Sequence, residues 1–327
     1  MPSADQPRFV VTGRLPEPAL ALLREAGDVA VADSGAPLPR EELLAHVAGA
    51  NAIVCFLYDR VDAELLDAAG PSLRVVANVA VGYDNVDLVA AAERGVAVTN
   101  TPGVLDDATA DLTMALLLAA ARRLGEGERL IRARHPWAWG LDFMLGRELR
   151  GKRLGIVGLG AIGGRVARRA RAFGVEIAYA NRNAADPALV AELGAERLEL
   201  DELLASSDFV SLHTPLTEAT RGLISTEHLA LMKPEAILVN TARGPVVDEA
   251  ALAAALREGR IAAAALDVYE HEPRVHPDLL ELENVVLLPH LGSATVETRE
   301  AMATLAARNA VAVAAGKSPP TPVPLPG

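Results

Sequence analysis

The feature that most constrains this chain is a glycine-rich turn between two apolar runs near the middle of the sequence. Its glycines, Gly158, Gly160 and Gly163, have the G-x-G-x-x-G spacing. Leu154–Val157 predicts a strand before the turn, a helical pattern follows it, and Val175–Tyr179 predicts a second strand. In such a unit the first glycine permits a tight turn, the second lets the backbone approach a pyrophosphate, and the third lets helix and strand pack closely. We therefore predict a dinucleotide-binding unit whose helix N-terminus faces the phosphates.

The end of the second predicted strand indicates which dinucleotide is preferred. NAD-binding units usually carry an Asp or Glu there, which bonds the ribose 2′-hydroxyl. This chain has Ala180, Asn181 and Arg182 instead. No acid stands at these positions to repel a 2′-phosphate, and the Arg182 guanidinium can pair with one. We predict NADP(H) as the preferred cofactor and NAD(H) as an alternative.

The alternation of short apolar runs with helical patterns indicates the fold class. The chain has 327 residues, of which 51% are hydrophobic and only 3% aromatic. A core of Ala, Val and Leu suits parallel strands that are covered by helices on both faces. We predict an α/β protein with two doubly wound parallel-sheet, Rossmann-like domains and a cleft between them.

The predicted strands and helices divide the chain into two domains. In the first half we expect strands at Phe9–Thr12, Val29–Ala32, Ala52–Phe56, Val75–Ala77 and Ala97–Thr99, with helices at Glu17–Glu25, Arg40–Ala48, Ala63–Ala68 and Val86–Arg94. A long helix is expected at Leu105–Leu124, further strands at Asp208–Leu212, Ala236–Asn240, Ala262–Asp267 and Val285–Leu288, and a last helix at Thr295–Ala315. The predicted domains are a discontinuous substrate-binding domain, residues 1–101 and 291–327, and a dinucleotide-binding domain, residues 102–290.

Composition excludes several other classes of protein. The net charge is −12 and no long Lys/Arg block is present, so a nucleic-acid partner is not expected. Cys55 is the single cysteine, so we expect a buried core thiol rather than a disulfide framework, and no metal site. The N-terminal segment lacks a signal pattern, and the apolar stretch Ala110–Ala121 is too short to span a bilayer. We expect a cytoplasmic protein with no membrane partner.

Four further segments point to a known family. They are Val-Ala-Val-Gly-Tyr-Asp-Asn at 79–85, Asn-Thr-Ala-Arg-Gly at 240–244, Leu-Asp-Val-Tyr-Glu-His-Glu-Pro at 266–273, and Pro-His-Leu-Gly-Ser-Ala-Thr at 289–295. With the glycine turn, their order and spacing resemble those of the D-isomer-specific 2-hydroxyacid dehydrogenases, over about residues 9–322. Within that family the chain is most similar to glyoxylate and hydroxypyruvate reductases. The resemblance implies NAD(P)H-dependent reduction of a small 2-oxo acid to the D-2-hydroxy acid by hydride transfer.

Three residues suit the chemistry of that reduction. The planar fork of Arg243 can pair with a substrate carboxylate and polarise the neighbouring carbonyl. His290 can supply the proton, because imidazole gives and takes protons near neutral pH. Glu272 can bond the far ring nitrogen, orient the ring and stabilise its charged form. The resemblance implies the same catalytic roles for all three, and Glu272 rather than the nearby Glu270 aligns with the family motif.

The resemblance also implies the remaining contacts. The substrate would meet Arg243, His290, the apolar side chain of Leu57 and the backbone N–H groups of Val81 and Gly82. The predicted cofactor contacts are Thr109, Gly158, Gly160, Ala161, Ile162, Gly163, Asn181, Arg182, Asn183, His213, Thr214, Pro215, Thr241, Ala242, Arg243, Asp267, His290 and Gly292. Among them, Asp267 ends a predicted strand and can accept from the carboxamide of a nicotinamide.

Apolar residues outside the predicted core indicate an assembly. The expected helix Leu105–Leu124 is apolar nearly all round, and a single lobe offers too little surface to bury such a helix. The segment His135–Phe143 holds both tryptophans, Trp137 and Trp139, and tryptophan is enriched at interface hot spots. The resembled family pairs two chains through this region. We therefore expect a homodimer in which one of the tryptophans reaches the partner's substrate pocket.

Two alternatives stay open at this point. Another member of the family, of phosphoglycerate or D-lactate type, is disfavoured only in part: phosphoglycerate dehydrogenases normally show Asp at the position of Ala180, and formate dehydrogenases show Gln at that of Glu272. A non-enzymatic, dinucleotide-sensing corepressor-like protein can keep the Arg, Glu and His. Such proteins generally carry interaction tails, whereas about eight residues precede Phe9 here. The sequence does not fix which 2-oxo acid is used.

Overall fold

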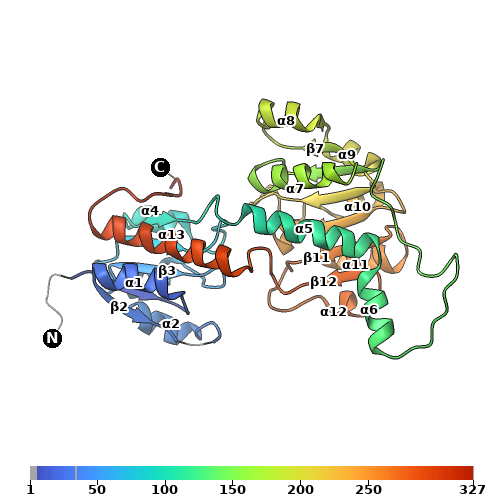
Figure 1. The fold of residues 1–327 in the computed structure, drawn as a ribbon. Coiled ribbons are helices and arrows are strands. Elements are labelled where there is room, and N and C mark those ends of the chain that lie inside the picture. The colour runs from blue at the N-terminus through green and yellow to red at the C-terminus, as the bar shows by residue number, and fades with distance from the viewer. Residues whose placement is uncertain (1–5, 34, 327) are drawn as a thin grey trace. The chain divides into compact units, whose positions relative to one another are not determined.

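The computed structural model describes residues 6–33 and 35–326 of the chain. The chain divides into two compact units, which are described here one at a time (Figure 1). Unit 1 comprises Met1–Leu105 and Ser293–Gly327, and unit 2 comprises Asp106–Gly292. Each unit is a parallel sheet with helices on both faces, so the predicted α/β class with two doubly wound sheets is confirmed.

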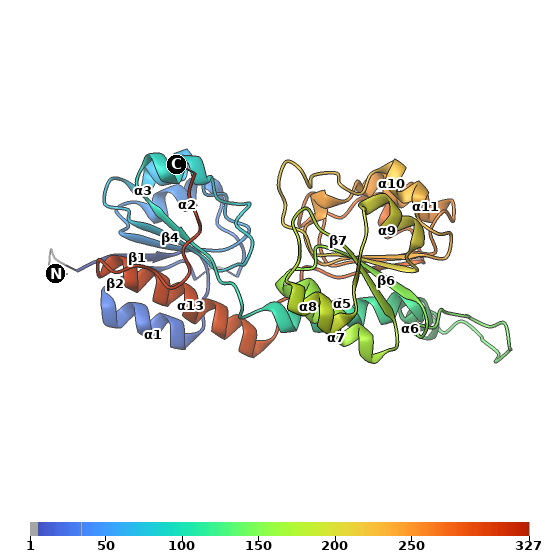
Figure 2. The same ribbon diagram turned by 90° about the horizontal axis from the view of Figure 1, so that it is seen from above.

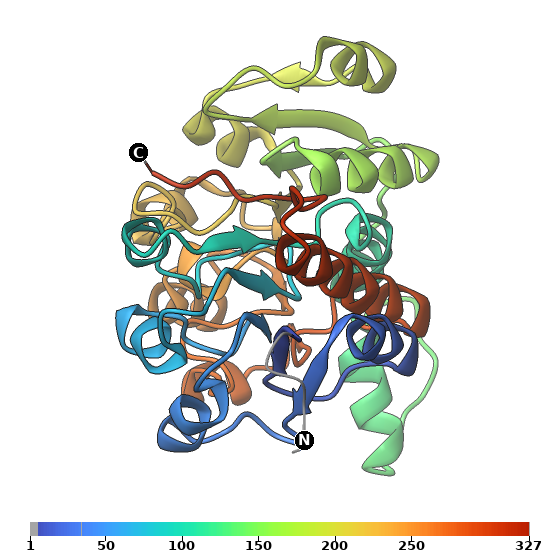
Figure 3. The same ribbon diagram turned by 90° about the vertical axis from the view of Figure 1, so that its left-hand side faces the viewer.

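Unit 1 is built on a five-stranded parallel sheet in the order β2-β1-β3-β4-β5. The strands are β1 (Arg8–Val11), β2 (Asp28–Val31), β3 (Ala52–Cys55), β4 (Val75–Asn78) and β5 (Ala97–Thr99). The helices are α1 (Glu17–Ala26), α2 (Arg40–Val47), α3 (Ala63–Ala69), α4 (Leu88–Glu93) and α13 (Val296–Ala314). Figures 2 and 3 show α1 and α13 side by side on one face of the sheet, and in Figure 2 α2 and α3 lie on the other.

The central strands of unit 1 explain why it folds as predicted. β3 and β4 are buried along their whole length, as expected for apolar strands covered on both faces. Cys55, at the end of β3, is a buried free thiol, which confirms its predicted place in the core. The C-terminal segment runs back along β5, where the Val323 N–H donates to the Val98 carbonyl (2.8 Å).

Unit 2 has a seven-stranded parallel sheet in the order β12-β11-β10-β9-β6-β7-β8. The strands are β6 (Arg153–Val157), β7 (Glu176–Ala180), β8 (Glu196–Arg197), β9 (Phe209–Leu212), β10 (Ile237–Asn240), β11 (Ala263–Leu266) and β12 (Val285–Leu287). This is the dinucleotide-binding order, in which the chain reverses direction across the sheet between β6 and β9. Ligands of such sheets bind beyond the carboxyl ends of the strands at that switch point.

Helices cover both faces of the second sheet. They are α5 (Asp106–Ala121), α6 (Leu124–Arg132), α7 (Ala161–Ala172), α8 (Pro187–Leu193), α9 (Leu200–Ser206), α10 (Thr226–Leu231), α11 (Glu249–Arg257), α12 (Pro277–Leu280) and the short 3-10 turn η1 (Gly244–Val246). Figure 2 shows α5 and α7 on one face and α9, α10 and α11 on the other. No helix of the described residues is long and apolar enough to cross a bilayer.

The long helix expected at Leu105–Leu124 is present as α5, but it ends at Ala121, and the separate helix α6 that follows it was not expected. Arg123 has a left-handed backbone (φ 54°), which a right-handed helix cannot contain, so α5 ends and α6 begins there. α5 packs against α7, β10, β11 and β12, all within unit 2. Because Met114, Leu116 and Leu117 are buried in this way, one unit does bury most of the apolar helix. The expectation that α5 needs a second chain for its burial is therefore wrong.

Candidate active site

The three glycines of the turn after β6 have different physical roles. Gly158 has a left-handed backbone (φ 102°), and a Cβ there would lie 2.8 Å from the backbone carbonyl of His213. A Cβ at Gly163 would lie 2.3 Å from the Gly158 oxygen, so α7 packs directly on the turn. At Gly160, in contrast, nothing lies within 4 Å of where a Cβ would stand. Two glycines are thus required by the fold, and the third leaves an open approach to the backbone.

A cavity of about 940 Å³ opens at this turn, inside unit 2. It is lined by the loops that follow β6, β7 and β9, which is the switch point of the sheet. Half of the predicted cofactor contacts line it: Gly158, Gly160, Ala161, Asn181, Arg182, Asn183, His213, Thr214 and Pro215.

The polar groups around the cavity fit a dinucleotide. The first-turn N–H groups of α7 have no partner within the helix, as at any helix start, and no side chain of the N-cap residue Gly160 accepts from them. The Thr214 hydroxyl is buried and, within the described part of the chain, has no hydrogen-bond partner. Unpaired donors of this kind are suited to phosphate oxygens. The residues present therefore fit the predicted cofactor.

The position that selects between cofactors carries a neutral amide. The Asn181 side chain accepts a hydrogen bond from the Leu159 N–H (2.7 Å) and thereby ties the end of β7 to the glycine turn. Arg182 is exposed at the cavity, and Arg197 from β8 donates to the Asn181 carbonyl (3.2 Å). The acid Asp186 also lines the cavity, but its carboxylate caps α8 by accepting from Ala188 N–H (2.9 Å). Arg182 therefore lines the cavity, Arg197 contacts the Asn181 backbone without lining it, and a second acid, Glu199, also lines the cavity.

His290 and Glu272 form a direct pair in unit 2. His290 Nδ1 lies 2.8 Å from Glu272 Oε2, and Glu272 Oε1 accepts from the Tyr269 N–H (3.1 Å). Burial acts to raise the pKa of Glu272, but the bonds to His290 and Tyr269 and the nearby charge of Arg243 lower it overall. The carboxylate is therefore charged at neutral pH, and Nε2 is the ring nitrogen left for a substrate.

Asp267 holds the loop that carries the histidine. Its two carboxylate oxygens accept from the N–H groups of Leu291 (2.6 Å) and Gly292 (2.7 Å), and its carbonyl accepts from the His290 N–H (2.9 Å). His290 itself has a left-handed backbone (φ 56°), a conformation that a surrounding network must enforce. Desolvation raises the pKa of the buried Asp267 carboxyl despite these bonds. The sequence alone did not reveal that this acid fixes the His290 loop.

Arg243 stands on a loop that packs against the loop carrying Glu272. The Asn240 amide donates to the Arg243 carbonyl (2.9 Å), and Arg243 Nη1 donates to the Ala242 carbonyl (2.8 Å). A Cβ at Gly244 would lie 1.8 Å from the Tyr269 carbonyl carbon, so only glycine allows the two loops to meet. The structure thus brings Arg243, Glu272 and His290 to one region of unit 2.

A second set of predicted cofactor residues lies together beside the His290 loop. The Thr113 hydroxyl donates to the Thr109 carbonyl (2.8 Å) and lies 2.9 Å from the Thr241 hydroxyl. A Cβ at Gly292 would lie 3.5 Å from Thr109. These contacts join the start of α5 to the loops after β10 and β12.

His213 is kept neutral by its surroundings. Its Nε2 lies 2.8 Å from the Ser211 hydroxyl at the end of β9. Burial lowers the pKa of His213 to about 4, so the ring carries no charge at neutral pH. It offers the cavity a hydrogen-bonding group without a charge.

The predicted substrate residues outside this region belong to unit 1. Leu57 lies in the loop after β3, and Val81 and Gly82 lie in the loop after β4. All three are half-buried at the carboxyl edge of their own sheet.

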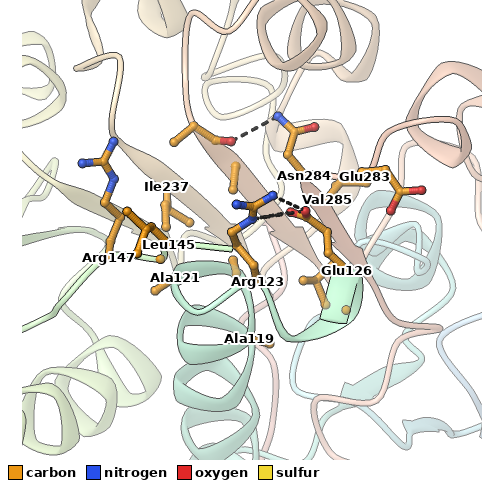
Figure 4. A pocket seen from close by; sticks show the side chains of 16 residues that line it. Ala119, Ala121, Arg123, Glu126, Leu145, Arg147, Ile237, Glu283, Asn284 and Val285 are labelled. Carbon is orange, nitrogen blue, oxygen red and sulfur yellow. Dashed lines mark hydrogen bonds and ion pairs between the residues drawn. The ribbon is translucent and has the colours of Figure 1, made fainter. Parts of the chain in front are cut away.

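Unit 2 holds another cavity, of about 260 Å³, at the opposite edge of its sheet (Figure 4). It is lined by the first residues of β10, β11 and β12 and by the end of α5. Arg123 pairs there with Glu126 (2.6 Å), and Asn284 donates to the Ala262 carbonyl (3.1 Å). None of the predicted site residues lines this cavity, and it lies at the amino ends of the strands, away from the switch point.

Comparison with known proteins gives the family. Residues 114–292 match the model described as "D-isomer specific 2-hydroxyacid dehydrogenase, NAD binding domain". The chain is 50% identical over 320 residues to a glyoxylate reductase of Thermococcus onnurineus, covering 97% of this chain and 95% of that protein. It is 51% identical over 321 residues to a glyoxylate reductase of Aeropyrum pernix, with 96% and 95% covered.

A solved structure agrees with these relatives. It is an NADPH-dependent glyoxylate/hydroxypyruvate reductase from Sinorhizobium meliloti in complex with NADP and malonate. It has a TM-score of 0.83 and 36% identity, and the match covers 97% of each chain.

Proposed function

This chain belongs to the D-isomer specific 2-hydroxyacid dehydrogenase family, and from that premise we propose that it reduces glyoxylate and hydroxypyruvate to the 2-hydroxy acids. The product would be the D isomer wherever carbon 2 becomes chiral. The observation that carries the proposal is the pairing of His290 with Glu272 beside Arg243, in a chain half identical to glyoxylate reductases over nearly its full length.

Arg243 would bind the substrate. Its guanidinium can donate two parallel hydrogen bonds, one to the carboxylate and one to the adjacent carbonyl oxygen. The second bond withdraws electron density from carbon 2 and makes it a better hydride acceptor. The close packing of Gly244 on Tyr269 keeps this loop in place, so the backbone that carries Arg243 is fixed.

His290 would give the proton. Its Nδ1 faces Glu272, so the proton destined for the substrate oxygen must reside on Nε2. The negative charge of Glu272 stabilises the doubly protonated ring, and the Asp267 contacts hold the loop in register. The same pair can accept the proton when the reaction runs toward oxidation.

A nicotinamide dinucleotide supplies the hydride when bound, and we propose NADP(H) as the preferred form, with NAD(H) also accepted. The neutral Asn181, the exposed Arg182 and the absence of an acid at Ala180 support that preference. The NADPH-dependent relative from Sinorhizobium meliloti is consistent with it.

We propose that dinucleotide binding and substrate binding belong to different parts of the chain, as the sequence motifs suggest. Residues 102–290 would bind the dinucleotide, since the cavity and the glycine turn lie among them. Residues 1–101 and 291–327 would bind the substrate, through Leu57 and the loop that contains Val81 and Gly82.

We also propose that two copies of the chain associate. Trp137, Trp139 and Leu141 are 56%, 79% and 85% exposed, far more than large apolar side chains usually are in a monomer. The ring of Trp137 stacks on Phe143, with their centroids 6.1 Å apart, so the segment presents an ordered apolar surface. Figures 1 and 2 show this segment, which follows α6, as a loop standing away from the body of unit 2.

The experiment that tests the proposed function is a panel of 2-oxo acids assayed with NADPH and with NADH. We expect the highest kcat/KM for glyoxylate or hydroxypyruvate with NADPH. Higher values for a larger 2-oxo acid would move the chain to another branch of its family. No turnover with any acid, alongside tight cofactor binding, would favour a dinucleotide-sensing role instead.

A further inference from the structure

Two asparagine side chains hold the peptide groups of the loop after β4, entirely within unit 1. The Asn100 amide donates to the Val81 carbonyl (2.7 Å), and the Asn78 amide donates to the Gly82 carbonyl (3.0 Å). Asn78 ends β4 and Asn100 directly follows β5, so neighbouring strands present both donors to one loop. Two consecutive peptide planes are therefore fixed by side chains of the sheet edge.

The fixed carbonyls decide where the next N–H groups point. In a planar trans peptide, the carbonyl of one residue and the N–H of the next are directed to opposite sides. The N–H groups of Gly82 and Tyr83 must therefore point away from the two amides. Across residues 6–33 and 35–326, no hydrogen bond uses either N–H, and both residues are partly exposed. Two adjacent donors are thus oriented and left unpaired.

Asn78 is itself held by a polar network. Its amide also donates to the side-chain oxygen of Asn85 (3.0 Å), and its own oxygen accepts from the Cys55 thiol (3.6 Å). Asn85 in turn donates to the carbonyls of Phe56 (3.1 Å) and Asp59 (3.0 Å). The loop that contains Leu57 and the loop that contains Gly82 are therefore fixed to each other.

Asn100 is held from the other side by the C-terminal segment. Its carbonyl accepts from the Thr321 hydroxyl (2.7 Å), and its N–H donates to the Thr321 carbonyl (3.3 Å). The buried Asn309 of α13 donates to the same hydroxyl (2.7 Å). These contacts fix the backbone of Asn100, from which its side-chain amide reaches the Val81 carbonyl.

We propose that Asn78 and Asn100 are positioning residues for substrate binding: they hold the N–H group of Gly82, one of the two donors expected from the sequence, and that of Tyr83, in place of the expected Val81, ready to bind the substrate's carboxylate. The inference rests on the proposed function, since that function supplies the carboxylate. Donors fixed in advance bind an anion without the loss of conformational freedom that a loose loop would suffer. The bonds they form are charge-assisted and hence strong.

The test replaces each amide by a carboxylate of the same shape, in Asn78→Asp and Asn100→Asp. Either change removes the donor and sets an oxygen against the loop carbonyl. We expect KM for glyoxylate to rise on the order of 10-fold. We expect kcat to change little, because the carboxylate is bound equally in the ground and transition states. NADPH binding, measured by fluorescence, should be unchanged.

Asn51→Asp is the matched control. The Asn51 amide donates to the Ser72 carbonyl (3.3 Å), but it precedes β3 at the amino edge of the same sheet. Because a buried carboxylate can destabilise the unit, Asn78→Ser, Asn100→Ser and Asn51→Ser should be compared as well. These variants remove the donor without adding charge.

The proposal is overturned if the variants at 78 and 100 keep the KM of the Asn51 variants. It is also overturned if kcat and NADPH binding fall together with the melting temperature, as a merely structural role predicts. Wild-type protein that turns over no 2-oxo acid would contradict the proposed function rather than this inference.

Discussion

At the scale of the residue, the contact between His290 Nδ1 and the Glu272 carboxylate decides which ring nitrogen is available to a substrate. His290 Nδ1 faces a carboxylate whose pKa is lowered, so Glu272 keeps its charge through neutral pH. The ring is therefore oriented through Nδ1 and directed to act through Nε2. Because the histidine loop is pinned by Asp267, this geometry exists before any substrate binds.

His290→Gln should lower kcat by on the order of 10²-fold or more, since general acid catalysis contributes about 10²–10⁴. NADPH binding should be largely kept, because the cavity at the glycine turn does not include this side chain. His271→Gln, at an exposed histidine of the neighbouring loop, is the control and should leave kcat unchanged. Near-normal turnover of His290→Gln would mean that another group donates the proton.

The pH dependence of the reaction tests the pair. Reduction should weaken as pH rises, because the doubly protonated ring is lost. In Glu272→Gln the falling limb should move to lower pH, because no negative charge stabilises the imidazolium. A profile that climbs through this range in the wild type, or that stays in place in the variant, would be incompatible with the pairing.

The cofactor preference is a second prediction at this scale. Ala180→Asp combined with Arg182→Ser should reverse a preference for NADPH, because an acid would then face the 2′-phosphate and a cation would be lost. The ratio of kcat/KM values for the two cofactors should shift by on the order of 10-fold or more. Arg171→Ser, on the far end of α7, is a control arginine that does not line the cavity. Equal or better kcat/KM with NADH in the wild type would refute the preference itself.

At the scale of the element, the strands were the most predictable part of the molecule. Runs such as those of β3 and β10 are apolar and short, and each ends at a polar residue or a turn, so period and length identify them. β8 was missed because it has two polar, exposed residues at a sheet edge. The end of α5 was expected three residues too late and α6 was missed, because Arg123 has no turn-forming character although its backbone is left-handed.

The site was predictable only in part, for a related reason. Motifs mark Arg243, Glu272 and His290, and the structure brings them together. Their meeting depends on Gly244 packing against the Tyr269 backbone, a contact between loops that no local pattern encodes. The same holds for the amides of Asn78 and Asn100, whose roles appear only when β4 and β5 are side by side.

Substitutions at two loop glycines should distinguish an effect on stability from an effect on NADPH binding. Gly244→Ala forces a Cβ into the Tyr269 backbone, so the melting temperature and kcat should both fall. Gly160→Ala places a methyl group in open space, so the melting temperature should hold. Its dissociation constant for NADPH should rise instead, because the methyl group occupies the approach to the pyrophosphate. Calorimetry of both variants measures the melting temperature and the dissociation constant for NADPH. Unchanged NADPH binding by Gly160→Ala would contradict the assigned role of this glycine.

At the scale of the whole molecule, what remains unburied is as informative as the core. α5 does not require a second chain, since unit 2 buries it. The large apolar side chains of the segment after α6 are different, because Trp139 and Leu141 are almost fully exposed. The case for association therefore rests on that segment, and the sequence identified it through its tryptophans and not through α5.

We expect light scattering at micromolar concentration to give twice the mass of the chain. Trp137→Ala and Trp139→Ala remove the aromatic surface that would be buried between copies, so each should shift the equilibrium toward monomer. Phe173→Ala removes an exposed aromatic ring elsewhere on unit 2 and should leave the mass unchanged. A monomer mass for the wild type would refute the dimer.

If the dimer stands, one tryptophan variant should also alter the selectivity between hydroxypyruvate and glyoxylate. Unchanged selectivity in both would remove only the claim that a tryptophan reaches the partner's pocket.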